Sequence, residues 1–70
     1  MRPDEFNALL LQRPFRKLRL YVTGGETFDV RHPEAAIVGR STVSLERPTD
    51  ENAGATAVIS LLHIVWVEVS

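Results

Sequence analysis

The segment LRLYVTGGETFDV, which begins at Leu18, constrains the fold of this chain more than any other part of its sequence. Apolar and polar residues alternate on both sides of Thr-Gly-Gly, the pattern of two half-buried strands joined by a tight turn. A two-residue Gly-Gly loop would set Leu20 opposite Asp29 and mix the apolar and polar faces, which sheet pairing resists. A three-residue Thr-Gly-Gly loop sets Leu20 opposite Phe28 and gives Gly25 the left-handed position that this loop class needs. We therefore predict an antiparallel hairpin in the second register.

This register also decides which charged side chains share the outer face of the hairpin. It pairs Arg19 with Asp29 and sets Lys17 opposite Arg31. Like charges that face each other across a sheet are mildly destabilising. A nearby carboxylate or an external anion could relieve the repulsion between Lys17 and Arg31. One interpretation is a solvated strand face, and the other is a small basic patch that contacts phosphate or an acidic partner. The candidate anion or nucleic-acid contacts are Lys17, Arg19, Arg31 and Arg40.

The rest of the chain predicts a helix before the hairpin and three strands after it. Pro3 and the acidic residues behind it favour a helix start, and Pro14 ends the helix. Gly39 indicates a bend or bulge within the third strand. RPTDENAGATA, from Arg47 to Ala57, has no large apolar side chain and predicts an exposed loop. The predicted elements are a helix over about 3–13 and strands over about 16–23, 26–32, 36–46, 57–62 and 64–69.

The last predicted strand is apolar on both faces. Val65, Val67 and Val69 share one face, and Ile64 and Trp66 share the other. Apolar residues on both faces imply burial on both faces, which leaves Trp66 either in the core or in an interface. The short helix can cover only part of one sheet face, so curling of the sheet or a second subunit must cover the rest. The candidate oligomer interface is Ile64, Trp66 and Val67.

Length and composition set further bounds. The chain has 70 residues, which corresponds to a single domain over 1–70 that buries only about 60% of its unfolded surface. Without any cysteine it has no disulfide or thiolate metal site, and we expect no metal and no cofactor. The net charge is −1, whereas a dedicated nucleic-acid binder is usually more basic. No apolar run reaches the roughly 18 residues of a membrane span, so we expect no membrane partner and a cytoplasmic location.

His32 and His63 are the residues that most resemble an acid–base site. His32 falls at the end of a predicted strand and His63 at the junction of two strands, where a histidine usually makes one local hydrogen bond. A base, a metal site or a pH switch formed by the two is the alternative. No Ser-His-acid constellation, phosphate-cradling glycine loop or paired-carboxylate motif is recognisable. We therefore expect no catalytic residues and no enzyme.

The order of these elements, a short helix followed by five strongly bent strands, resembles the Sm-like fold and its bacterial Hfq branch in particular. DEFNALLLQRPFRKLRLYVTGGETFDV is similar to that family's helix, first strand, glycine turn and second strand, and AVISLLHIVWVEV is similar to its last two strands. RPFRKLRLYVTGGETFDVRHPE also resembles small uncharacterised bacterial proteins of about this length. The resemblance implies a mainly β fold, with the helix followed by a five-stranded antiparallel barrel of Sm-like or SH3-like type. It also implies ring assembly by edge-strand pairing.

Two functions follow as candidates. The first is a non-enzymatic binding module that forms a homo-oligomer through its edge strands and presents a surface to a protein partner. The second is an Sm-like RNA-binding protein that uses a basic patch around Lys17 and Arg31. The Hfq branch carries a Lys-His pair just before its last strand, and that pair contributes to RNA binding. The corresponding positions here hold Leu61 and Leu62, so RNA is a candidate partner without a family motif.

Overall fold

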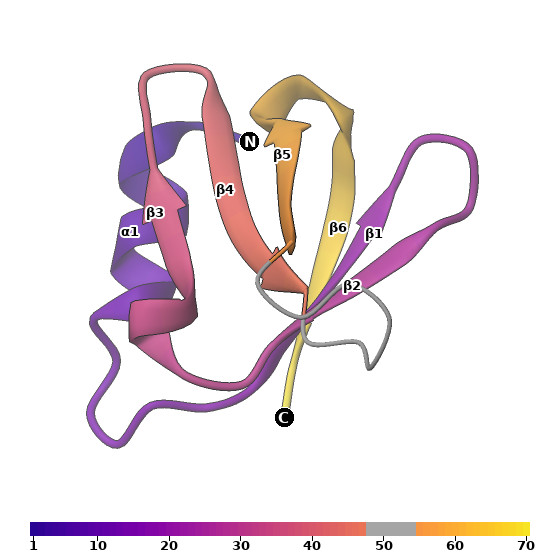
Figure 1. The fold of residues 1–70 in the computed structure, drawn as a ribbon. Helices are drawn as coiled ribbons and strands as arrows, with labels where there is room; N and C mark the ends of the chain where they lie inside the picture. Colours follow the sequence, from indigo (N-terminus) through magenta and orange to yellow (C-terminus); the bar gives the residue numbers. More distant parts are fainter. Residues whose placement is uncertain (48–54) are drawn as a thin grey trace.

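The computed structural model describes residues 1–47 and 55–70, and within them one helix is followed by six strands (Figure 1). The helix and strands are α1 (Pro3–Leu10), β1 (Leu18–Val22), β2 (Thr27–Val30), β3 (Ala36–Val38), β4 (Thr42–Arg47), β5 (Ala55–Ser60) and β6 (Ile64–Val69). Two short 3-10 helices, η1 (Pro33–Ala35) and η2 (Leu61–His63), lead into β3 and β6. The chain is therefore mainly β with an N-terminal helix, as predicted. Most of the predicted loop after β4 lies outside the described residues.

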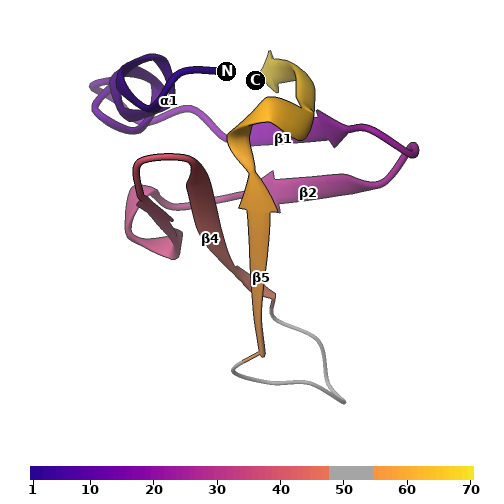
Figure 2. The ribbon, with the colours of Figure 1, turned by 90° about the horizontal axis from the view of Figure 1, so that it is seen from above.

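The described strands form two three-stranded antiparallel sheets. One sheet has the strand order β2-β1-β6 and the other β3-β4-β5. Figure 2 shows that β5 runs across the direction of β1 and β2, and Figure 1 shows α1 alongside β3. At both places where the chain passes from one sheet to the other, a 3-10 helix interrupts the strand, so the described strands do not close into the predicted five-stranded barrel.

The β1–β2 hairpin has the predicted register. The Cα partners are Leu18 with Val30, Arg19 with Asp29, Leu20 with Phe28 and Tyr21 with Thr27. The turn closes with a hydrogen bond of 3.1 Å from the Gly25 nitrogen to the Val22 carbonyl. Gly24 and Gly25 have φ angles of 98° and 92°, a region that L side chains rarely adopt. The turn therefore needs two glycines, although the sequence argument required only one.

The predicted third strand, residues 36 to 46, is a hairpin of two strands. The Gly39 nitrogen donates a 2.7 Å hydrogen bond to the Thr42 carbonyl, and Ala36 then pairs with Leu45. The expectation of one bent strand was wrong because the residues between β3 and β4 reverse the chain. The sequence does contain the signal, since inward-facing positions change from even to odd numbers between Val38 and Val43.

A bulge in β6 changes the faces of its first residues. Ile64 and Trp66 pair with consecutive residues of β1, so Val65 is the extra residue. Ile64 is buried, whereas Val65 is 65% exposed. The prediction that Ile64 shares a face with Trp66, and Val65 with Val67, is wrong because strict alternation does not hold across a bulge.

Several element boundaries also differ from those expected: β1 and β2 are shorter at both ends, and β5 begins at Ala55, within the predicted loop of residues 47 to 57. α1 ends at Leu10 rather than near residue 13, and β5 ends at Ser60 because the next three residues form η2. The Leu11 nitrogen donates the last helical hydrogen bond, 3.0 Å to the Asn7 carbonyl. No helix in the described ranges is long and apolar enough to cross a bilayer.

The core lies between the two sheets and α1. Its buried side chains within the described residues are Phe6, Leu18, Leu20, Val30, Ala36, Val43, Leu45, Ile59, Leu61 and Ile64. Phe6 is the buried residue of α1 and is completely shielded from solvent. The nitrogen of Met1 donates a 3.0 Å hydrogen bond to the Leu61 carbonyl, which ties the start of the chain to η2. Every strand therefore contributes to a core that is small.

Leu20→Ala should lower the free energy of unfolding by about 2–5 kcal/mol, because truncating a completely buried leucine leaves a cavity. Leu62→Ala is the matched control, because Leu62 is 86% exposed and its truncation should cost less than about 0.5 kcal/mol. Urea denaturation followed by circular dichroism measures both values. Equal losses in the two variants would contradict the placement of the core.

Candidate functional site

The outer face of the β2-β1-β6 sheet displays polar and aromatic side chains in rows that cross the three strands. Because β1 is the middle strand, each of its outward residues has a neighbour on either side. Two of the rows are Asp29–Arg19–Glu68 and Thr27–Tyr21–Trp66. A third lies at the end of the sheet, where the Ser70 nitrogen donates to the Lys17 carbonyl at 3.0 Å and Arg31 follows β2. We call this surface the outer sheet face.

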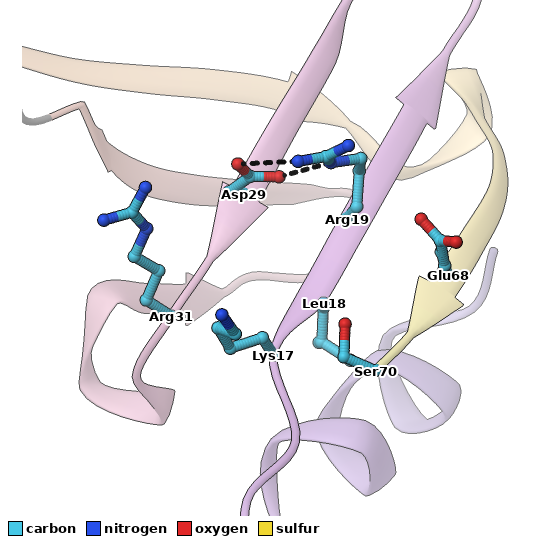
Figure 3. A pocket seen from close by; sticks show the side chains of 7 residues that line it. All are labelled: Lys17, Leu18, Arg19, Asp29, Arg31, Glu68 and Ser70. Carbon is cyan, nitrogen blue, oxygen red and sulfur yellow. Dashed lines mark hydrogen bonds and ion pairs between the residues drawn. The ribbon is translucent and has the colours of Figure 1, made fainter.

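A hollow of about 240 Å³ lies at the end of the outer sheet face where β1 begins (Figure 3). Its lining residues are Lys17, Leu18, Arg19, Asp29, Arg31, Glu68 and Ser70. Three of these side chains are cationic and two are anionic, so the side chains that line the hollow have a net charge of +1. Lys17 and Arg31 are exposed, and neither side chain has an ion pair or hydrogen bond to another described residue.

Arg19 and Asp29 form an ion pair in the middle of this surface, as the hairpin register predicted. The Arg19 Nε donates to Asp29 Oδ1 at 2.8 Å, and Nη2 lies 3.4 Å from Oδ2. The hydrogen bond from Arg19 lowers the pKa of Asp29, the charges of Arg31 and Lys17 act in the same direction, and burial opposes them. The same pair raises the pKa of Arg19. Asp29 is thus paired directly with Arg19, and its carboxylate attracts Lys17 and Arg31 without a direct ion pair to either.

An aromatic pair lies at the other end of the outer sheet face. The rings of Tyr21 and Trp66 stack with centroids 3.8 Å apart and an interplanar angle of 3°. The Tyr21 hydroxyl also donates to Glu68 Oε1 at 3.3 Å, which holds the tyrosine in place. Trp66 stays 51% exposed, and Lys17 lies four positions before Tyr21 in the chain, a span of about 13 Å. Sequence reasoning did not single out Tyr21, because its partner lies on a strand that the hairpin pattern does not specify.

Arg40 is separate from this surface. It lies in the turn between β3 and β4, in the other sheet, and does not line the hollow. The structure therefore brings together Lys17, Arg19 and Arg31, but not the fourth predicted contact.

The two histidines also lie apart. The His63 carbonyl accepts a 2.8 Å hydrogen bond from the Thr23 nitrogen at the turn of the β1–β2 hairpin, whereas His32 follows the opposite end of β2. Both side chains are exposed. Within residues 1–47 and 55–70, no group of three or more His, Asp or Glu could hold a metal ion.

The three predicted interface residues occupy different environments. Ile64 belongs to the core, Val67 packs partly against it, and Trp66 is exposed. Other exposed apolar side chains lie on the second sheet, where Ile37 and Val58 flank Ser44 in one cross-strand row. The large exposed apolar residues of the described chain are Leu11, Ile37, Val58, Leu62, Val65, Trp66 and Val69.

Comparison of the chain with protein-family models, curated proteins and solved structures found no match. The Sm-like resemblance therefore rests on the sequence segments alone. What the protein binds has to be argued from the chemistry of its own surface.

Asp29→Asn should reduce the amount by which the stability of the folded protein falls as the pH is lowered. Because the pKa of Asp29 is lowered in the folded protein, its ionised form contributes stability that is present above its ordinary value of 3.8 and is lost as the pH falls through the lowered value. Melting temperatures across the acid range should show the wild type and the variant converging below that value. Arg19→Gln should produce the same flattening, and a difference that does not change with pH would contradict this account.

Proposed function

We propose that the protein is a small non-enzymatic binding module whose binding surface is the outer sheet face. The observation that carries this proposal is the pair of cations, Lys17 and Arg31, beside one hollow. The nearest carboxylate on β2, Asp29, is already paired with Arg19. Two like charges held together repel each other in the absence of a partner, and an anionic partner would relieve that repulsion. The exposed ring of Trp66 adds apolar contact area on the same face.

Sm-like RNA binding is the more specific candidate for this module. Proteins that bind single strands combine cations for the phosphates with aromatic rings on which bases stack. The outer sheet face offers both, with Lys17 and Arg31 at one end and Trp66 at the other. The resemblance of the helix and hairpin segments to the Sm-like family supports the same candidate. An acidic segment of a protein partner is the alternative ligand for the same cations.

Fluorescence of Trp66 can test both ligands, because it is the only tryptophan in the chain. We expect a short single-stranded RNA to change the emission saturably, with an affinity that falls steeply as salt is raised. Polyglutamate is the second probe, and binding of polyglutamate in place of RNA would identify an acidic protein partner. Failure of both probes to bind at low salt would contradict the proposed surface.

Matched charge reversals test where the probe binds. Lys17→Glu with Arg31→Glu should abolish binding. Arg13→Glu with Arg40→Glu changes the net charge by the same amount, at exposed residues that do not line the hollow. This double variant should retain most of the binding affinity. Equal weakening in the two double variants would mean that overall charge, rather than this surface, governs binding.

We also propose that the module forms a homo-oligomer through its edge strands. Two open three-stranded sheets leave β2, β6, β3 and β5 as edges, and an unpaired edge is a template for pairing with another chain. Exposed apolar side chains lie on three of these edges, Ile37 on β3, which is 72% exposed, and Val58 on β5 and Val65 on β6, each 65% exposed. Association would bury these side chains and add to the small core.

Val58→Lys and Val65→Lys should each keep the fold, because both side chains are exposed, and at least one should reduce the number of subunits. Native mass spectrometry and sedimentation velocity measure the change, and the variant that dissociates identifies the edge. Leu11→Lys, at a 69% exposed position just after α1, is the control. A wild-type protein that is monomeric at high micromolar concentration would contradict self-assembly.

A further inference from the structure

We infer that the hollow between Lys17 and Arg31 is a site for a compact, doubly charged anion of the phosphate monoester class. This inference rests on the proposed binding surface and names the ligand of one part of it. In Figure 3 the two cationic side chains come from the start of β1 and the end of β2 and lie beside the same hollow. Their combined charge matches that of a phosphate monoester near neutral pH.

The charges around the hollow favour a small ligand. Asp29 is held by Arg19 at 2.8 Å and attracts the two free cations without a direct ion pair to either. Glu68 lies on the other side of β1, where it pairs in register with Arg19 and accepts from the Tyr21 hydroxyl. The free positive charge is therefore concentrated at Lys17 and Arg31, at one end of the outer sheet face.

The chemistry of the two cations suits phosphate oxygens. The planar guanidinium of Arg31 can donate two parallel hydrogen bonds to one phosphate, and the ammonium of Lys17 adds a mobile point charge. Neither group has to break an ion pair with another described residue in order to bind.

The row Asp29–Arg19–Glu68 explains why the ligand should be a terminal or free phosphate. Asp29 stays ionised at neutral pH, because its pKa is lowered by Arg19 and by the nearby cations. A strand that runs from the hollow to Trp66 passes the carboxylates of Asp29 and Glu68 with Arg19 between them, so the strongest attraction is for a terminal phosphate in the hollow itself. A phosphate monoester occupies the hollow without crossing this row.

Titration of the protein with inorganic phosphate, followed by amide NMR at neutral pH and constant ionic strength, tests the site. We expect saturable shifts at Lys17, Arg31 and Ser70. Lys17→Gln should raise the dissociation constant about tenfold, because it removes one charge-assisted hydrogen bond. Arg40→Gln removes the same charge outside the hollow and should leave the constant unchanged. The NMR spectrum of each variant also reports whether it is folded.

Non-saturating shifts, or equal losses in Lys17→Gln and Arg40→Gln, would overturn the site. Short RNAs with and without a 5′-phosphate then distinguish a strand terminus from a free small phosphate. If RNA binds equally with either end and inorganic phosphate does not compete, the proposed surface stands and the monoester site is wrong. If inorganic phosphate binds but neither RNA nor polyglutamate does, the hollow stands and the proposed function is wrong.

Discussion

The alternation of side chains along β1 couples the core of this protein to its candidate binding surface. Leu18 and Leu20 point inward and are almost completely buried, and the residues between and around them form the middle of the outer sheet face. A slip of one residue against β2 would turn both leucines outward and bury Arg19. The packing of the two leucines in the core therefore also fixes which cations share the hollow. The strand register alone sets the relative positions of the residues on the outer sheet face.

The features that could be predicted from the sequence are those set by residues close to one another in the chain. The register of the β1–β2 hairpin, and with it the Arg19–Asp29 pair, follows from a short loop and from the pattern on either side of it. The reversal at Gly39 is equally local, and its signal is the change of parity in the inward-facing positions. The sequence pattern did not distinguish a bend within one strand from a turn between two strands at this position, because a glycine is compatible with both.

The features that sequence could not predict depend on pairing between distant strands. The bulge at Val65 arises where β6 meets β1, more than 40 residues apart in the chain, and it turns Ile64 into the core. The Tyr21–Trp66 stack depends on the same pairing. The resemblance to a five-stranded barrel could not show that β3 and β4 are separate strands, or that 3-10 turns divide the sheet in two.

Within the candidate binding surface, the two central side chains of β1 are held by their neighbours. Arg19 is held by Asp29, and Tyr21 is held by Trp66 and Glu68. A net charge of −1 for the whole chain does not prevent this local excess of positive charge, since the carboxylates nearest the cations are already engaged. Within the described residues, the side chains of Lys17 and Arg31 have no such contact, so they are the charged side chains that a partner would have to order. Arg19 and Tyr21 are thus ordered before any ligand binds, whereas Lys17 and Arg31 would lose side-chain freedom on binding, which is an entropic cost that the proposed site has to overcome.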